Sequence, residues 1–172
     1  MKLTIANNQS EIPVVTAPIR RVAVGAARAL ERSTPLTLHE LSVAIVNDAK
    51  IARLNWQFLR HRGPTDVITF DYSVAADGMV GTRGSRVRPL SRTSRRLVPT
   101  NGHGRIGEIV ISAETAQAQA RRYRRSLEEE LARYVVHGLL HLAGQDDTTP
   151  VQRRQMRRRE NELLRSIQTK GK

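Results

Sequence analysis

The most informative stretch of the sequence is His137-Gly138-Leu139-Leu140-His141-Leu142-Ala143-Gly144-Gln145-Asp146-Asp147. Its two histidines are four residues apart in an apolar helical pattern, so both lie on one helix face and can reach one ion. Gly144 can end the helix in a left-handed conformation and turn Asp147 back as a third ligand. Three protein ligands leave a coordination position for water, which is typical of a catalytic metal site. Two core histidines bonded to backbone are the alternative explanation.

Zinc proteases also carry paired helical histidines, but there a glutamate that activates the water follows the first histidine. Here that residue is Gly138. A glycine inside a helix costs about 1 kcal/mol relative to alanine. Its presence therefore predicts the close approach of another segment or of a substrate, and protease chemistry lacks its usual base.

The longer pattern resembles the YbeY family of bacterial rRNA maturation factors, whose signature is H-G-x-L-H-L-x-G-x-D-H. Seven positions match, and Asp147 stands in place of the final histidine. Two further blocks resemble the family: Leu54-Asn55 with Pro64-Thr65-Asp66-Val67 and Phe70, and Gly107-Glu108-Ile109-Val110-Ile111-Ser112. The first of these blocks carries, in the family, an arginine implicated in RNA cleavage. Its position falls on Leu59 here, with Arg60 beside it.

This resemblance implies a metal-dependent endoribonuclease that cleaves single-stranded RNA in rRNA maturation and ribosome quality control, with the small ribosomal subunit as partner. It also implies an α+β fold, in which helices pack on a small mixed sheet and the histidine helix is central. One divalent ion would be held by His137, His141 and Asp147. Zinc is the first expectation, and the carboxylate ligand also suits Mn²⁺ or Mg²⁺.

The resemblance and the neighbouring residues also suggest catalytic side chains. We expect Arg60 and His61 to face the negative charge that develops on phosphorus. Glu108 and His61 are both candidates for the general base, and the sequence does not choose between them. Asp66 or Thr65 are expected to brace the site.

The composition predicts a polyanionic partner. The chain of 172 residues is expected to form a single domain, and its formal charge of +13 comes from 29 basic and 16 acidic residues. Arginine suits phosphate oxygens, so RNA is favoured over a membrane, and a solvated arginine-rich surface is the alternative. The basic run that we expect to bind RNA contains Arg121, Arg122, Arg124 and Arg125.

Two absences from the sequence bear on location and binding. There is no cysteine, which excludes disulfides and thiolate metal ligands, and the N-terminus is too polar for a signal peptide, so a cytoplasmic protein is expected. Only six residues are aromatic, so charge is expected to contribute more to RNA capture than extended base stacking. Oligomeric state is left open.

Local patterns predict strands at 2–5, 40–46, 67–72 and 106–111, and helices at 17–31 and from Asn47-Asp48 to about residue 59. Capping boxes open the histidine helix at Ser126 and a C-terminal helix at Thr149. Residues 78–105 contain seven arginines, no acidic residue and no aromatic residue. They are expected to form a flexible insertion, either an RNA-binding arm or a tolerated surface loop.

Two other functions compete with RNA cleavage. The first is a metal-dependent hydrolase of another substrate, against which Gly138 and the arginine content argue. The second is a non-catalytic, ribosome-associated RNA-binding protein. This alternative is plausible because Leu59 and Asp147 depart from the family pattern.

Overall fold

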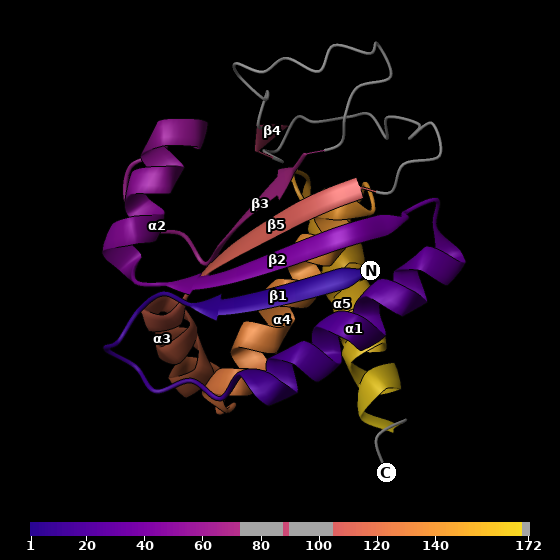
Figure 1. The fold of residues 1–172 in the computed structure, drawn as a ribbon, viewed down its shortest axis with the longest axis horizontal. Coiled ribbons are helices and arrows are strands. Elements are labelled where there is room, and N and C mark those ends of the chain that lie inside the picture. The colour runs from indigo at the N-terminus through magenta and orange to yellow at the C-terminus, as the bar shows by residue number, and fades with distance from the viewer. Residues whose placement is uncertain (73–87, 90–104, 170–172) are drawn as a thin grey trace.

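The computed structural model describes residues 1–72, 88–89 and 105–169 as one sheet with helices on both faces (Figure 1). The elements in chain order are β1 (Lys2–Asn7), α1 (Thr16–Ser33), β2 (Leu38–Val46), α2 (Asp48–Leu54), the π-helical turn η1 (Asn55–Leu59), β3 (Val67–Asp71), β4 (Arg88–Pro89), β5 (Arg105–Ser112), α3 (Ala113–Tyr123), α4 (Leu127–Leu142) and α5 (Pro150–Thr169).

The sheet is mixed, with the strand order β1-β2-β5-β3-β4. Strands β1, β2 and β5 are parallel, whereas β3 runs antiparallel to β5 and β4 antiparallel to β3. The parallel strands need long connections, which α1 supplies between β1 and β2. The predicted α+β fold with a small mixed sheet is therefore confirmed.

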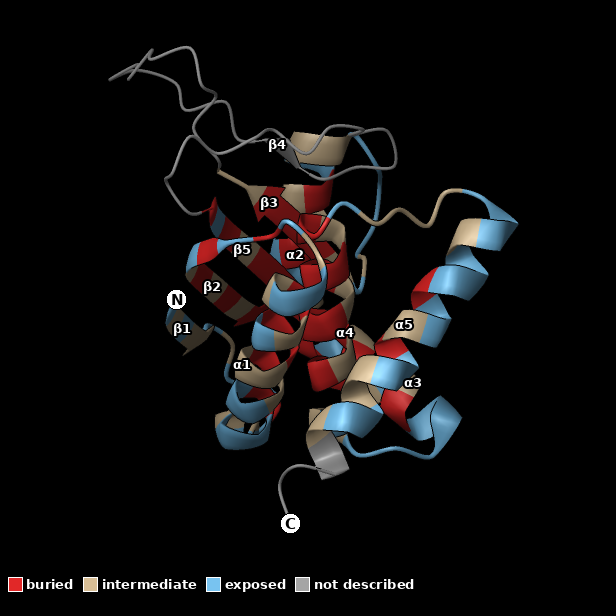
Figure 2. Cartoon of the chain, turned by 90° about the vertical axis from the view of Figure 1, so that its right-hand side faces the viewer, coloured by how far each residue is buried: buried red, intermediate tan, exposed pale blue. Residues whose placement is uncertain are grey.

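Alternate side chains along the strands belong to two separate hydrophobic cores. On β5, Ile109 and Ile111 belong to the larger core with α1 and α4, whereas Val110 belongs to a smaller core with Ile51 of α2. Because successive side chains of a strand point to opposite faces, α2 covers one face and the histidine helix α4 covers the other. Figure 2 shows α4 buried at the centre, while α1, α3 and α5 expose their outer sides. The predicted central position of the histidine helix is confirmed.

The predicted helix starts are confirmed by their hydrogen bonds. Ser126 and Glu129 form a complete capping box at the start of α4. Thr149 and Gln152 bond reciprocally at the start of α5, and the Asn47 side chain accepts from the Lys50 backbone at the start of α2. The strand and helix ranges predicted from sequence each overlap the observed element.

One helix was not predicted as an element of its own. Helix α3 begins directly after β5, with Ser112 as its N-cap, and its buried residues are Ala113, Ala116 and Ala120. Alanines give a weak apolar pattern, so the periodicity that revealed the other helices is faint here.

The expected insertion at 78–105 lies outside the described residues, except for Arg88–Pro89 and Arg105. Its last residue was wrongly included, because Arg105 is the first residue of β5 and is buried. Its Nη1 atom lies 3.3 Å from Asp71 Oδ2 and donates to the Leu142 backbone oxygen at 3.0 Å. This arginine thus joins the sheet to the C-terminal end of α4. Within the described ranges, no helix is both long and apolar enough to cross a membrane.

Candidate metal centre and its cleft

Helix α4 places the two motif histidines one turn apart with their rings edge to face. Their Nε2 atoms lie 3.0 Å from each other. Each side chain is partly buried, because the helix packs against the sheet on one side and against α5 on another. The spacing of four residues has therefore brought two imidazole nitrogens to one point, as the sequence predicted.

The other nitrogen of each ring is held by an acceptor. His141 Nδ1 lies 3.0 Å from the Gln145 backbone oxygen, and His137 Nδ1 lies 2.7 Å from Glu160 Oε1. A carbonyl oxygen only accepts, so His141 carries its hydrogen on Nδ1. An ionised Glu160 also only accepts, so His137 likewise carries its hydrogen on Nδ1. The two Nε2 lone pairs then face each other, which is unfavourable unless a proton or a metal ion lies between them, so the arrangement can accommodate a metal ion.

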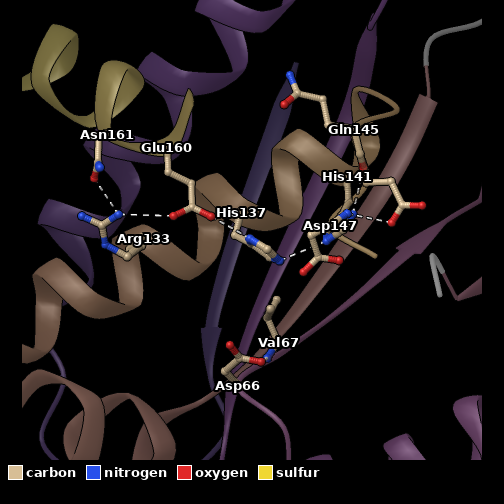
Figure 3. A network of polar contacts seen from close by, with 10 residues as sticks. Asp66, Val67, Arg133, His137, His141, Gln145, Asp147, Glu160 and Asn161 are labelled. Carbon is tan, nitrogen blue, oxygen red and sulfur yellow. Dashed lines mark hydrogen bonds and ion pairs between the residues drawn. The ribbon is translucent and has the colours of Figure 1, made fainter. Parts of the chain in front are cut away.

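The loop after α4 brings a carboxylate to the same point. Gly144 adopts a φ of 86°, the left-handed conformation that the sequence predicted. Ligand atoms of His137, His141 and Asp147 then all lie within 4.8 Å of one another. The backbone N–H of Asp147 donates to the Asp146 carboxylate at 2.8 Å, which fixes the turn and leaves the Asp147 side chain beside the rings (Figure 3).

Sequence reasoning missed Glu160, although it contacts the site directly. Its Oε1 faces His137 and its Oε2 accepts from Arg133 Nη1 at 3.2 Å. Arg133 also donates to Asn161 Oδ1 at 2.9 Å, so α5 and α4 are joined through a continuous polar chain that ends at the metal centre (Figure 3). Glu160 lies 23 residues after His137 in an arginine-rich helix, and no local pattern connects the two.

Burial and neighbouring charges move the pKa values of the two histidines apart. Burial lowers the pKa of His137, but the hydrogen bond and the charge of Glu160 outweigh it, and the pKa lies above its usual value. Burial and the proximity of His137 hold the pKa of His141 below its usual value. Without a metal, the first proton to enter the site therefore goes to His137.

Gly138 permits the close packing of α4 on the sheet. A Cβ at this position would lie 2.8 Å from Ile109 Cδ1 and 2.9 Å from Thr69 Oγ1. The sequence left open whether a segment or a substrate approaches here, and the structure shows that β5 and β3 do. A side chain at this position would push away from the sheet the helix that holds both histidines.

The metal centre opens into a cleft of about 720 Å³ between β3, α3, α4 and α5. Thr65 and Asp66, the residues expected to brace the site, line this cleft together with the histidines. Asp66 Oδ1 accepts from Thr65 Oγ1 at 3.0 Å and from the Val67 backbone at 2.9 Å. Its negative charge also contributes to raising the pKa of His137.

The predicted catalytic residues are only partly gathered here. His61 lines the cleft, whereas Arg60 is not among its lining residues and places its guanidinium 5.7 Å from the Trp56 ring centre. Glu108, a candidate base, is not a lining residue either. It lies on the α2 face of β5 and accepts from the Tyr72 hydroxyl at 2.6 Å, because strand alternation points it away from α4.

Arginines from α4, from α5 and from the loop before α4 border the cleft. Arg125 is the one member of the predicted RNA-binding run that lines it, and Arg121, Arg122 and Arg124 are exposed nearby. Arg133, Arg153 and Arg157 line the side formed by α4 and α5. Arg153 Nη1 donates to the Thr148 backbone oxygen at 2.8 Å, whereas Arg157 is exposed. The position of these α5 arginines beside the metal centre was not predicted from the sequence.

The chain is similar to proteins of one family. The profile of a family described as Endoribonuclease YbeY matches residues 4–168. A protein named Endoribonuclease YbeY from Pelotomaculum thermopropionicum is 32% identical over 164 residues, covering 95% of each chain. A Bacillus subtilis protein of that name is 32% identical over 136 residues, covering 79% of this chain and 77% of its own.

Two further similarities differ in extent. A Myxococcus xanthus protein of the same name is 39% identical over 138 residues, covering 80% of this chain but only 40% of its own length. A solution structure of a Thermotoga maritima protein superimposes with a TM-score of 0.55 at 18% identity, covering 98% of this chain and 91% of that one. At this identity the likeness concerns the fold alone.

Proposed function

The chain belongs to the YbeY endoribonuclease family, and on that premise we propose that it cleaves single-stranded RNA in the cleft beside His137, His141 and Asp147. The observation that carries the proposal is the convergence of two Nε2 atoms and a carboxylate at one end of an arginine-lined cleft. The converging nitrogens and carboxylate suit a cation, and the arginines along the cleft suit a polyanion.

We further propose that these three side chains hold one divalent ion. Two imidazoles and one carboxylate suit Zn²⁺, and the carboxylate makes Mn²⁺ or Mg²⁺ acceptable. When bound, such an ion supplies a Lewis acid for a phosphoryl oxygen or for a water. Glu160 and the Gln145 carbonyl orient the imidazoles so that both Nε2 atoms remain available as ligands.

The remaining catalytic roles are proposed from position. His61 stands on the cleft wall and is the available candidate for moving a proton, since Glu108 faces the other side of the sheet. Arg157 lines the α5 side of the cleft and is proposed to neutralise charge that develops on phosphorus. Arg60 neighbours His61 and is proposed to share this role, for which its guanidinium would have to leave the Trp56 ring. Arginine serves here because it stays charged and can pair two phosphate oxygens.

The substrate is proposed to be ribosomal RNA of the small subunit, processed in the cytoplasm. The net charge of +13 supports a polyanionic substrate, and Arg121, Arg122, Arg124 and Arg125 are proposed to contact its backbone. The open cleft supports a single strand over a duplex, because a strand can thread a groove while its bases remain unpaired.

The test is incubation of the purified protein with matched single-stranded and duplex RNA, with and without a chelator. We expect cleavage of the single strand, loss of cleavage with chelator, and loss in a His137→Ala, His141→Ala double variant. His39→Ala removes an exposed histidine on β2 and serves as the matched control, with unchanged cleavage.

The salt dependence of RNA binding gives a second measurement. For ~6 phosphate contacts, affinity should fall on the order of a thousandfold between 50 and 200 mM salt. Binding without cleavage under every metal tested would instead identify a non-catalytic RNA-binding protein. Equal cleavage of duplex and single strand would contradict the proposed substrate class.

A further inference from the structure

Tyr123 is an exposed aromatic residue that lines the cleft. It is the last residue of α3, its exposed fraction is 53%, and it lines the cleft together with the metal-site histidines. Among the described residues the other large aromatic of similar exposure is Trp56, which does not line the cleft. Tyr123 is therefore an exposed ring on the path that a substrate strand would follow.

Two arginines lie over this ring. The guanidinium carbons of Arg122 and Arg125 lie 5.7 Å and 5.3 Å from its centre. The chain reverses at Arg124, whose φ of 54° is left-handed, and the Arg125 backbone then bonds to Ala120 at 2.9 Å. This turn brings Arg125 back over a ring that precedes it by only two residues. The reversal preorganises an aromatic surface with positive charge around it.

A polar side chain near Tyr123 also lines the cleft. Gln119 lies one helical turn before Tyr123 on the same face of α3 and also lines the cleft. No hydrogen bond engages its amide within residues 1–72, 88–89 and 105–169. An amide offers both donors and an acceptor, as the edge of a nucleobase requires.

The spacing along α4 sets the distance to the metal centre. Arg125 pairs with Glu130 at 2.9 Å, and Glu130 precedes His137 by seven residues, roughly 10 Å along the helix. Stacked nucleotides rise ~3.4 Å each and an extended single strand spans more per nucleotide, so this span corresponds to at most about three nucleotides. A strand with its phosphate at the metal centre is long enough, after a few nucleotides, to reach Tyr123.

We propose that Tyr123 is a base-stacking subsite for single-stranded RNA, within about three nucleotides of the bond that is cut. The stacked base takes the place of one guanidinium over the ring, Gln119 faces the edge of that base, and Arg122 and Arg125 then contact the adjoining phosphates. The inference rests on the proposed function, because it assumes that RNA occupies the cleft. The competing explanation is that the ring and its arginines only stabilise the end of α3.

The test compares two oligomers of equal length and charge. One is a single-stranded 2′-O-methyl RNA of about ten nucleotides, a typical site size, and the other carries the same backbone without bases. Binding of the full chain in its metal-loaded form is measured by fluorescence anisotropy, and gels verify that neither oligomer is cut. The variants are Tyr123→Leu, which removes the aromatic face, and Tyr123→Phe, which keeps it.

We expect the wild type to prefer the base-bearing oligomer by about tenfold, in line with one stacked base. Tyr123→Leu should lose most of this preference while binding the baseless oligomer as before, and Tyr123→Phe should retain it. A preference that survives in Tyr123→Leu overturns the inference and leaves the proposed function standing. Failure of the wild type to bind either oligomer refutes the proposed RNA substrate itself. Unchanged binding with a lowered melting temperature in Tyr123→Leu would establish the purely structural role.

Discussion

The Nδ1 atom of His137 on α4 lies 2.7 Å from the Oε1 atom of Glu160 on α5. This contact makes the orientation of a metal-site imidazole depend on a helix that begins after the motif has ended. Because the second carboxylate oxygen of Glu160 binds Arg133, the acceptor has little freedom to turn away. The metal centre is thus fixed by tertiary packing as well as by the local motif.

The first prediction concerns this acceptor. Glu160→Gln should lower metal affinity by about 10- to 100-fold, since the amide is a weaker partner for the imidazole N–H and no longer carries charge. Metal titration with a competing chelator measures the effect. Glu162→Gln changes an exposed carboxylate two residues away, which pairs with Arg158, and should leave affinity unchanged. Equal affinities of the two variants would show that Glu160 has no influence on the metal.

Asp147→Ala should remove most of the metal affinity, because two histidines alone hold an ion weakly. Asp147→His should retain binding and shift preference toward zinc over Mn²⁺ or Mg²⁺, since imidazole is the softer ligand. Thr149→Ala is the control, because it removes the observed N-cap of α5 at a cost of about 1 kcal/mol in stability without removing a ligand. If Asp147→Ala lowers only the melting temperature, Asp147 is not a ligand.

Metal binding should weaken as pH falls, beginning with His137. Its pKa is raised in the metal-free protein, and a protonated imidazole cannot bind an ion, so competition starts at a higher pH than for an ordinary histidine. The lowered pKa of His141 means that its protonation follows at lower pH. Titrations between pH 8 and pH 5 measure the midpoint. Glu160→Gln should move that midpoint to lower pH, and an unmoved midpoint would contradict this assignment.

Gly138→Ala should destabilise the protein even though alanine is the better helix former. The new Cβ would overlap Ile109 Cδ1 and Thr69 Oγ1, and overpacking costs about 1 to 3 kcal/mol against about 1 kcal/mol of helix propensity. For a net loss of about 1 kcal/mol, the melting temperature should fall by roughly 2 to 4 °C. Adding Ile109→Val removes one overlapping methyl group and should restore part of the loss. A stabilised Gly138→Ala variant would refute the close-packing explanation.

Arg105→Ala should cost about 3 to 5 kcal/mol of unfolding free energy, because it breaks a buried ion pair with Asp71 and a hydrogen bond to the last residue of α4. Denaturant unfolding measures this loss. Arg158→Ala removes an exposed arginine paired with Glu162 and should change stability by no more than about 0.5 kcal/mol. Similar small effects in both variants would mean that Arg105 acts as a surface residue.

Short-range patterns explain what was predicted well. The histidine pair, the left-handed Gly144 and Asp147 fall within eleven consecutive residues, and the geometry of one helix and one turn brings their side chains together. The N-caps at Ser126 and Thr149 are equally local. Such features depend on neighbours in the chain, so the sequence carries them almost completely.

The sequence by itself therefore determined the metal-binding motif, four of the five described strands and most of the helices, because each follows from periodicity or from residues close together in the chain. The two-residue strand β4 was not predicted, because it falls within the expected insertion. Only the tertiary structure decided that Glu160 holds His137, that Glu108 faces away from the cleft, and that Arg105 belongs to a buried strand. Each of these outcomes depends on which face of the sheet α4 and α5 cover. The packing of segments far apart in the chain makes that choice. Alternating apolar residues along a strand show that the sheet has two buried faces, but they do not show which helix covers which face.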